Sequence, residues 1–135
     1  MTLVEMRLMP EEAEVINHRI EVTDAMAQVF GPSGDGVWGF DTDEEAEERL
    51  KELLDGMIHT LSNGAMHITF DIHNEDQIRV LEELVDGNTM DSIAEDMVNQ
   101  GTDEKVHKQG LDLKYHMKRI NVKWRNAGLS SSFAV

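Results

Sequence analysis

The sequence contains no cysteine, and this absence excludes several kinds of chemistry from a chain of 135 residues. Without thiols the protein can form no disulfide bond, no thiolate-ligated metal site and no cysteine nucleophile. A chain without cysteine is also compatible with a reducing compartment, which is a first reason to expect a cytoplasmic protein.

Long apolar segments are missing as well, and no stretch approaches the roughly 20 residues with which a helix crosses a bilayer. The first residues, MTLVEMRLMPEEAEV, carry acids where a signal peptide has a basic flank and an apolar core. We therefore expect no membrane association and a cytoplasmic location. The length suits one ordinary hydrophobic core, or a small core with an appended module.

Cations are scarce, since 12 Lys and Arg stand against 27 Asp and Glu, and the formal net charge is -15. The two signs are also separated along the chain. Residues 1–104 hold 26 acids and five cations, a net charge of -21, whereas residues 105–135 hold seven cations and one acid, a net charge of +6. This asymmetry is typical of a nucleic-acid-binding end joined to an acidic, partner-binding end. An acidic protein whose basic last helix packs on its own body has the same pattern.

Hydrophobic spacing predicts a mainly α protein with a small two-stranded β element. In the first part of the chain, helices are expected over residues 10–31, 41–61 and 74–85. Strands are predicted at 36–40 and, more clearly, at 65–72, where β-branched and aromatic residues follow Asn63-Gly64. Phe40 and Phe70 each precede an Asp and an acidic amphipathic helix, so we expect the two strands to pair into a small hairpin or two-stranded sheet. Two unrelated acidic helices would give the same layout.

From residue 88 onward the sequence predicts short helices separated by breaks. The first covers about ten residues, with Ile93, Ala94, Met97 and Val98 facing inward, and stops at Gly101. The second is capped by Thr102 and interrupted by Gly110. The last helix is capped by Asp112 and ends near residues 127–128.

This last helix carries the stretch LKYHMKRINVKWR, residues 113–125, with five cations and no acid. Helical spacing separates it into two stripes. The stripe predicted to be buried consists of Leu113, Met117, Ile120 and Trp124. The stripe predicted to be exposed consists of Lys114, Lys118, Asn121 and Arg125, with Tyr115 and Arg119 on its flank. Such a helix packs by one side and can present the other to a polyanion, because Arg and Lys bind phosphates and guanine edges and Asn can bind adenine.

The C-terminal segment, residues 75–135, resembles the LuxR/NarL-type helix-turn-helix domain. The residues that carry the resemblance in the first two helices of the motif are Val80, Leu81, Gly87, Ile93, Ala94 and Met97. Those in the recognition helix are Leu113, Lys114, His116, Ile120, Lys123 and Trp124. The chain has about nine more residues than the family before the recognition helix, which is an insertion in the turn. Asp112 stands where the family has a threonine.

The resemblance implies a DNA-binding transcriptional regulator that inserts its recognition helix into the major groove of double-stranded DNA, as a homodimer on two half-sites. Residues 75–135 would form the DNA-binding region, and residues 1–74 an acidic α(+β) region for a partner or for dimerisation. The expected DNA contacts are Lys114, Tyr115, Lys118, Arg119, Asn121, Lys123 and Arg125.

A second hypothesis is a protein-interaction module, such as a bacterial or phage-encoded inhibitor, whose acidic surface imitates DNA. Its contacts to a protein partner would lie in the acidic residues 41–55, and the basic helix would then pack on its own body or on another subunit.

No enzyme is expected, because no nucleophile and base stand in a recognisable arrangement. The chain has six His, and His67, Asp71 and His73 fall on one face of the predicted strand. A zinc site needs three or four convergent ligands at known spacings, and no such motif is present. We therefore predict no metal and no cofactor.

Overall fold

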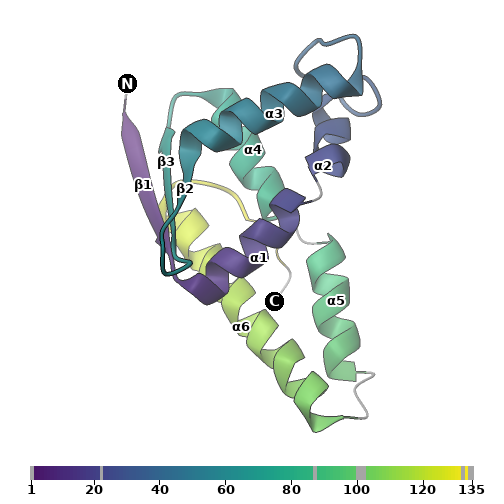
Figure 1. Cartoon of the computed structure of the whole chain (residues 1–135), viewed down its shortest axis with the longest axis vertical. Coiled ribbons are helices and arrows are strands. Elements are labelled where there is room, and N and C mark those ends of the chain that lie inside the picture. The colour runs from purple at the N-terminus through teal and green to yellow at the C-terminus, as the bar shows by residue number, and fades with distance from the viewer. Residues whose placement is uncertain (1, 22, 87, 100–102, 132, 134–135) are drawn as a thin grey trace.

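A computed structural model describes residues 2–21, 23–86, 88–99, 103–131 and 133. Within these residues the protein is mainly helical, with six helices and one three-stranded antiparallel sheet (Figure 1). The strands are β1 (Leu3–Leu8), β2 (Ile58–Thr60) and β3 (Met66–Asp71). The helices are α1 (Pro10–Glu21), α2 (Thr23–Phe30), α3 (Asp43–Met57), α4 (Glu75–Leu84), α5 (Asn88–Asn99) and α6 (Glu104–Asn126).

The central strand of the sheet is β3, which confirms the strand predicted at 65–72. It pairs antiparallel with β1 on one side and with β2 on the other. Its alternate residues Met66, Ile68 and Phe70 are buried, and Met6 and Leu8 of β1 lie opposite Ile68 and Met66 on the same inner face. Period-two alternation therefore selects one face of the sheet for the core.

The predicted strand at 36–40, and with it the predicted hairpin, are wrong. This segment is an irregular loop in which Gly36 and Gly39 have φ angles of 63° and 69°. Positive φ angles are accessible to glycine but incompatible with an extended strand. Trp38 instead stacks on Phe30, with the ring centroids 4.7 Å apart.

Two strands replace that hairpin, and neither was predicted. The helix expected over 41–61 is capped by Thr42 but ends at Met57, because Ile58 takes up an extended conformation and begins β2. The other strand, β1, comes from the first residues of the chain. Both strands depend on pairing with β3: β1 through a contact between distant parts of the chain, and β2 through a local hairpin that turns at Asn63-Gly64.

The helix predicted over 10–31 is present as two helices, α1 and α2, and Val22 between them lies outside the described residues. The two segments predicted on either side of Gly110 are instead one continuous helix, α6, whose N-cap is Asp103. The predicted stop at Gly101 and cap at Thr102 fall outside the described residues, as does Gly87.

Gly110 does not break α6, because glycine at this position allows the close approach of α5. A Cβ atom added there would lie 2.8 Å from the Cβ of Met97 and 3.0 Å from the backbone nitrogen of Val98. Helix packing thus outweighs the low helix propensity of glycine, which costs about 1 kcal/mol relative to alanine.

The hydrophobic core lies between the inner face of the sheet and helices α1, α3, α4 and α6 (Figure 1). The predicted buried stripe of α6 is confirmed, since Met117, Ile120 and Trp124 are fully buried and Leu113 packs at the edge. The Trp124 indole N–H donates to the Leu81 carbonyl over 2.8 Å, which satisfies the one polar group of that side chain. No helix in the described part of the chain is long and apolar enough to cross a bilayer.

Two glycines in helices should respond oppositely to alanine. We expect Gly110→Ala to lower the free energy of unfolding by about 1–3 kcal/mol, because the new methyl group overlaps Met97 and Val98. Gly56→Ala is the matched control in α3, since nothing lies within 4 Å of the place its methyl group would take, and it should raise that free energy by about 0.5–1 kcal/mol. Urea unfolding followed by fluorescence of the buried Trp124 measures both changes; equal effects would contradict the close α5–α6 packing.

Candidate interaction surface on the C-terminal helix

The carboxylate of Glu12 fixes the position of α6 against the N-terminal part of the chain. Glu12 is the third residue of α1 and is only 1% exposed. Its Oε1 atom accepts hydrogen bonds from the Met9 backbone N–H (2.7 Å) and the Lys123 ammonium (2.5 Å). Its Oε2 atom accepts from Nε of Arg119 at 3.2 Å. The bond to Met9 is the return half of a capping box, in which a glutamate at the third helical position binds the N-cap N–H.

The environment of Glu12 favours the ionised carboxylate. Burial alone raises the pKa of Glu12, but the hydrogen bonds from Lys123, the Met9 N–H and Arg119 outweigh it, so the pKa is lowered overall. A buried charge is tolerated when it is paired and fully hydrogen-bonded. Two cations of the predicted DNA-binding set thus serve to compensate one buried acid.

Lys123 and Arg119 make further contacts that extend this cluster. The Lys123 ammonium also donates to the Arg7 carbonyl of β1 at 2.9 Å. Arg119 donates to the Tyr115 hydroxyl at 3.3 Å and to the Met9 sulfur at 3.4 Å, and its guanidinium carbon lies 5.7 Å from the Tyr115 ring centroid. Glu12, Tyr115, Arg119 and Lys123, which we call the Glu12 cluster, therefore join β1, α1 and α6.

Lys114 is also paired within the molecule. Its ammonium donates to a carboxylate oxygen of Glu95 on α5. That hydrogen bond lowers the pKa of Glu95, and the charge of Lys114 adds to the effect. The pair contributes to holding α5 against α6.

Asn121 was predicted on the exposed stripe, and this placement is wrong because the side chain is only 4% exposed. Its amide nitrogen donates to the Phe133 carbonyl at 2.9 Å, and its amide oxygen accepts from the Ser131 hydroxyl. The residues after α6 fold back over this position, which the spacing within a single helix does not reveal. The amide is therefore satisfied inside the protein, as buried polar groups generally are.

Three of the predicted contact residues do project into solvent. Tyr115 is 56% exposed, and Lys118 and Arg125 are also exposed. Within the described residues no side-chain hydrogen bond or ion pair joins Lys118 or Arg125 to another group. These cations remain available for a ligand.

Large apolar side chains lie on the same outward face. Val122, seven residues after Tyr115 and so on the same side of the helix, is 52% exposed, and Met9 is 49% exposed. A cavity of about 370 Å³ beside this face is lined by Met9, Tyr115 and Arg119, together with Glu11, Glu12, Asp112 and His116. We call the following group the outer strip: Met9, Tyr115, Lys118, Arg119, Val122 and Arg125. Sequence reasoning missed Met9 and Val122, although the seven-residue spacing of Val122 from Tyr115 could have indicated the latter.

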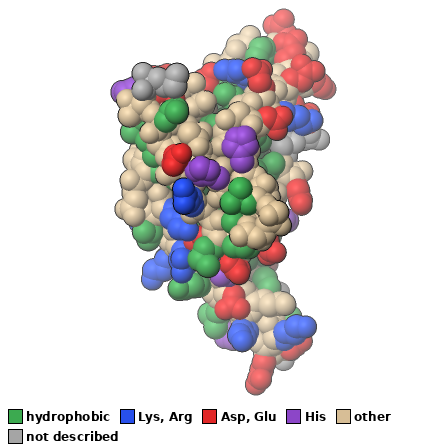
Figure 2. Space-filling view, turned by 60° about the vertical axis from the view of Figure 1, so that its left-hand side comes forward, with side chains coloured by type: hydrophobic (Ala, Val, Ile, Leu, Met, Phe, Trp, Pro, Cys, Tyr) green, Lys and Arg blue, Asp and Glu red, His purple; other side chains and the backbone are tan. Residues whose placement is uncertain are grey.

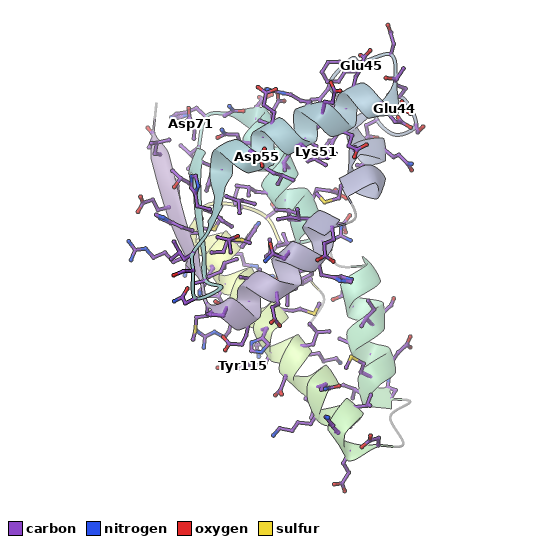
Figure 3. All side chains as sticks on the ribbon, in the orientation of Figure 1. Glu44, Glu45, Lys51, Asp55, Asp71 and Tyr115 are labelled. Carbon is purple, nitrogen blue, oxygen red and sulfur yellow. The ribbon has the colours of Figure 1, made fainter. Side chains whose placement is uncertain are left out.

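Besides Glu11, Glu12 and Asp112 at this cavity, acidic side chains gather on α3. Glu44, Glu45 and Asp55 project from α3, far from Tyr115 on α6 (Figure 3). In the space-filling view, several Lys and Arg side chains cluster on one side of the body, and many Asp and Glu lie at its upper end (Figure 2). Some acids of α3 have counterions, since Arg49 approaches Glu52 and Asp76, and Lys51 pairs with Glu47.

The histidines and acids of β3 do not converge on one point. His67 Nε2 lies 3.7 Å from a carboxylate oxygen of Glu5, and Asp71 accepts the backbone N–H of His73 at 2.9 Å. Among the described residues no group of three or more His, Asp or Glu has the geometry to hold a metal ion.

Comparison with known proteins gives no match, whether with protein-family models, curated protein sequences or solved structures. The resemblance to the LuxR/NarL-type domain stays a prediction from the residue pattern. The features of the molecule that bear on function are therefore the geometry of the outer strip and the ion pairs of Glu12.

Glu12→Gln should destabilise the protein in a pH-dependent way. At neutral pH we expect a loss of about 2–3 kcal/mol in the free energy of unfolding, less than for a fully enclosed ion pair because Arg119 and Lys123 are partly exposed. Because the pKa of Glu12 is lowered on folding, its contribution is present above the ordinary value of 4.5 and is lost as the pH falls through the lower, folded-state value.

Urea unfolding between neutral pH and pH 3 measures this effect. The wild type should lose stability relative to Glu12→Gln below about pH 4.5, so that the two curves converge. Glu95→Gln is the control, because it removes a carboxylate from an exposed ion pair and should leave the unfolding midpoint nearly unchanged. If the stabilities of the wild type and of Glu12→Gln instead change in parallel with pH across this range, the role assigned to the Glu12 carboxylate is contradicted.

Proposed function

We propose that the chain is a binding protein that recognises another protein through the outer strip of α6. The observation that carries the proposal is the combination of three half-exposed apolar side chains with three cations on one face. Tyr, Met and Arg are enriched in the centres of protein interfaces. An exposed apolar strip with a charged border is also typical of an interaction site.

Charge complementarity indicates the chemistry of the partner. Lys118 and Arg125 lie along α6 with no counterion in the described residues. Arg119 binds Glu12 through Nε, and its Nη1 atom donates to the Tyr115 hydroxyl. The matching ligand is an acidic segment that also carries apolar side chains, such as an amphipathic helix with Glu or Asp beside Leu. The apolar contacts would supply affinity, and the charges would set orientation.

Binding of double-stranded DNA by a helix-turn-helix is the second candidate. The exposure of Lys118, Arg125 and Tyr115 favours it, together with the LuxR/NarL resemblance. In that arrangement α5 would be the scaffold helix and α6 the recognition helix, with the additional residues forming the first turns of α6. Against it, DNA-binding surfaces are strongly positive and polar. Here Lys114, Arg119 and Lys123 are paired with acids and Asn121 is buried.

The acidic residues 41–55 are the other surface proposed for a protein partner. Exposed carboxylates on α3 could attract a basic partner at long range, although at physiological salt this attraction is screened beyond about 8 Å. This surface is the natural control for the outer strip, because it differs from that strip in position and in sign.

Affinity capture with the full chain should distinguish these surfaces. We expect Tyr115→Ala/Val122→Ser to lose proteins that the wild type retains, and the binding of the strongest such protein, once purified, to weaken about tenfold or more in titration. Both residues are exposed, and Tyr115 loses only its surface contacts with Arg119, so the variant should unfold close to the wild-type midpoint. Glu44→Gln/Glu48→Gln, which changes the α3 surface, should bind like the wild type.

The competing functions predict other results in the same experiments. Loss of the partner in Glu44→Gln/Glu48→Gln but not in the Tyr115/Val122 variant would place the site on α3 and overturn the proposal. A fluorescence titration with duplex DNA at two salt concentrations tests the second candidate. Binding that weakens steeply with salt and disappears in Lys118→Ala/Arg125→Ala would favour DNA over a protein partner.

A further inference from the structure

Strand β1 forms an open edge of the sheet. One hydrogen bond shows which of its backbone N–H and C=O groups point toward β3 and which point away from it. The Ile72 N–H donates to the Thr2 carbonyl at 3.0 Å, which makes Thr2 and Ile72 a hydrogen-bonded pair. In an antiparallel ladder such pairs alternate with non-hydrogen-bonded ones. The even-numbered residues of β1 therefore bond to β3, and the N–H and C=O groups of Leu3, Glu5 and Arg7 point to the other side.

A contact from α6 agrees with this assignment. The Lys123 ammonium reaches the Arg7 carbonyl at 2.9 Å, as expected if that carbonyl points away from β3. Figure 1 shows β1 at the outer side of the sheet, and in the described part of the chain no further strand lies beyond it. Three residues thus direct backbone donors and acceptors away from β3 along an edge of six residues.

The edge of β1 borders an open groove. A groove of about 250 Å³ runs between β1 and the end of α6. It is lined by Val4, Glu5, Met6, Arg7, Lys123, Asn126 and Ala127. An exposed edge of this kind is a template for pairing with another strand unless charges or cover prevent it.

We propose that β1 pairs with β1 of a second copy of the chain, antiparallel across a two-fold axis, so that the two sheets join into one of six strands. An antiparallel edge is self-complementary under two-fold symmetry, which closes the assembly at a dimer. Backbone hydrogen bonds supply the contact, as in other additions of a strand to a sheet edge. This pairing rests on the backbone edge of β1 and does not depend on the function proposed for the outer strip.

The side chains of β1 select the register. Glu5 and Arg7 are both exposed, whereas Met6 between them points into the core. Pairing Glu5 opposite the partner's Arg7 creates two reciprocal pairs of opposite charge, and both residues in each pair offer outward backbone groups. The neighbouring register, in which the partner strand is shifted by two residues, would place Glu5 opposite the partner's Glu5. Opposite charges across an antiparallel pair are favourable and like charges are unfavourable.

Lys123 does not block this arrangement. A carbonyl oxygen has two lone pairs, so the Arg7 carbonyl can accept from the Lys123 ammonium and from a backbone N–H of the partner strand together. Lys123 would then lie beside the new pair of strands.

A charge exchange on β1 tests the pairing and its register. We expect the full chain to sediment as a dimer at equilibrium, and Glu5→Arg or Arg7→Glu to weaken the dimer about tenfold or more, because each places like charges opposite one another. The double variant Glu5→Arg/Arg7→Glu restores opposite charges and should recover the dimer. Glu48→Arg, which makes the same charge change on α3, should leave the mass unchanged.

Several outcomes would overturn the proposal. A wild-type chain that stays monomeric at high concentration would exclude self-pairing of β1. A double variant that remains as monomeric as the single ones would exclude this register. Glu5 lies outside the outer strip, so a chain that does not dimerise can still bind a partner through α6. In the same way, the Tyr115/Val122 variant should lose that partner but keep the mass of the dimer.

Discussion

The structure depends on the burial of one carboxylate, that of Glu12, at the point where three elements meet. The chain turns from β1 into α1 at this position, and Arg119 and Lys123 bring α6 to the same point. Without counterions a carboxylate so enclosed would be protonated or would draw water into the interior. This requirement accounts for part of the charge separation along the chain, because Arg119 and Lys123 of the last helix are the counterions of Glu12, the one buried acid among the described residues. Part of the basic character of the last helix is therefore structural.

The sequence predicted the structure correctly where a regular hydrophobic pattern extends over many neighbouring residues. The buried side of α6 and the central strand β3 were predictable, because Met117, Ile120 and Trp124 repeat at helical spacing and Met66, Ile68 and Phe70 alternate. The same reasoning failed where a contact between elements decides the local conformation. β1 and β2 exist because β3 offers them hydrogen bonds, and Gly110 stays helical because α5 packs on it. The pairing of β1 with β3 joins distant parts of the chain, whereas the β2–β3 hairpin is local, with its turn at Asn63-Gly64.

The candidate site illustrates the same division. Helical spacing correctly placed Lys118, Tyr115 and Arg125 on the outside of α6. It could not show that Arg119 and Lys123 bind Glu12, more than 100 residues earlier in the chain. Nor could it show that the C-terminal residues cover Asn121. Charge counted along the sequence overestimates the charge available to a ligand, because pairing in space removes part of it.

The continuity of α6 gives the molecule a mechanical property. A helix of 23 residues is a rod about 35 Å long, and α6 has no proline within it. The N-terminal part of this helix packs against α5, and the C-terminal part is anchored in the core through Trp124. The outer strip lies along its length. Because α6 is continuous, its contacts with α5, its ion pairs with Glu12 and the outer strip all lie on one rigid element, and none of them can shift along the helix relative to the others.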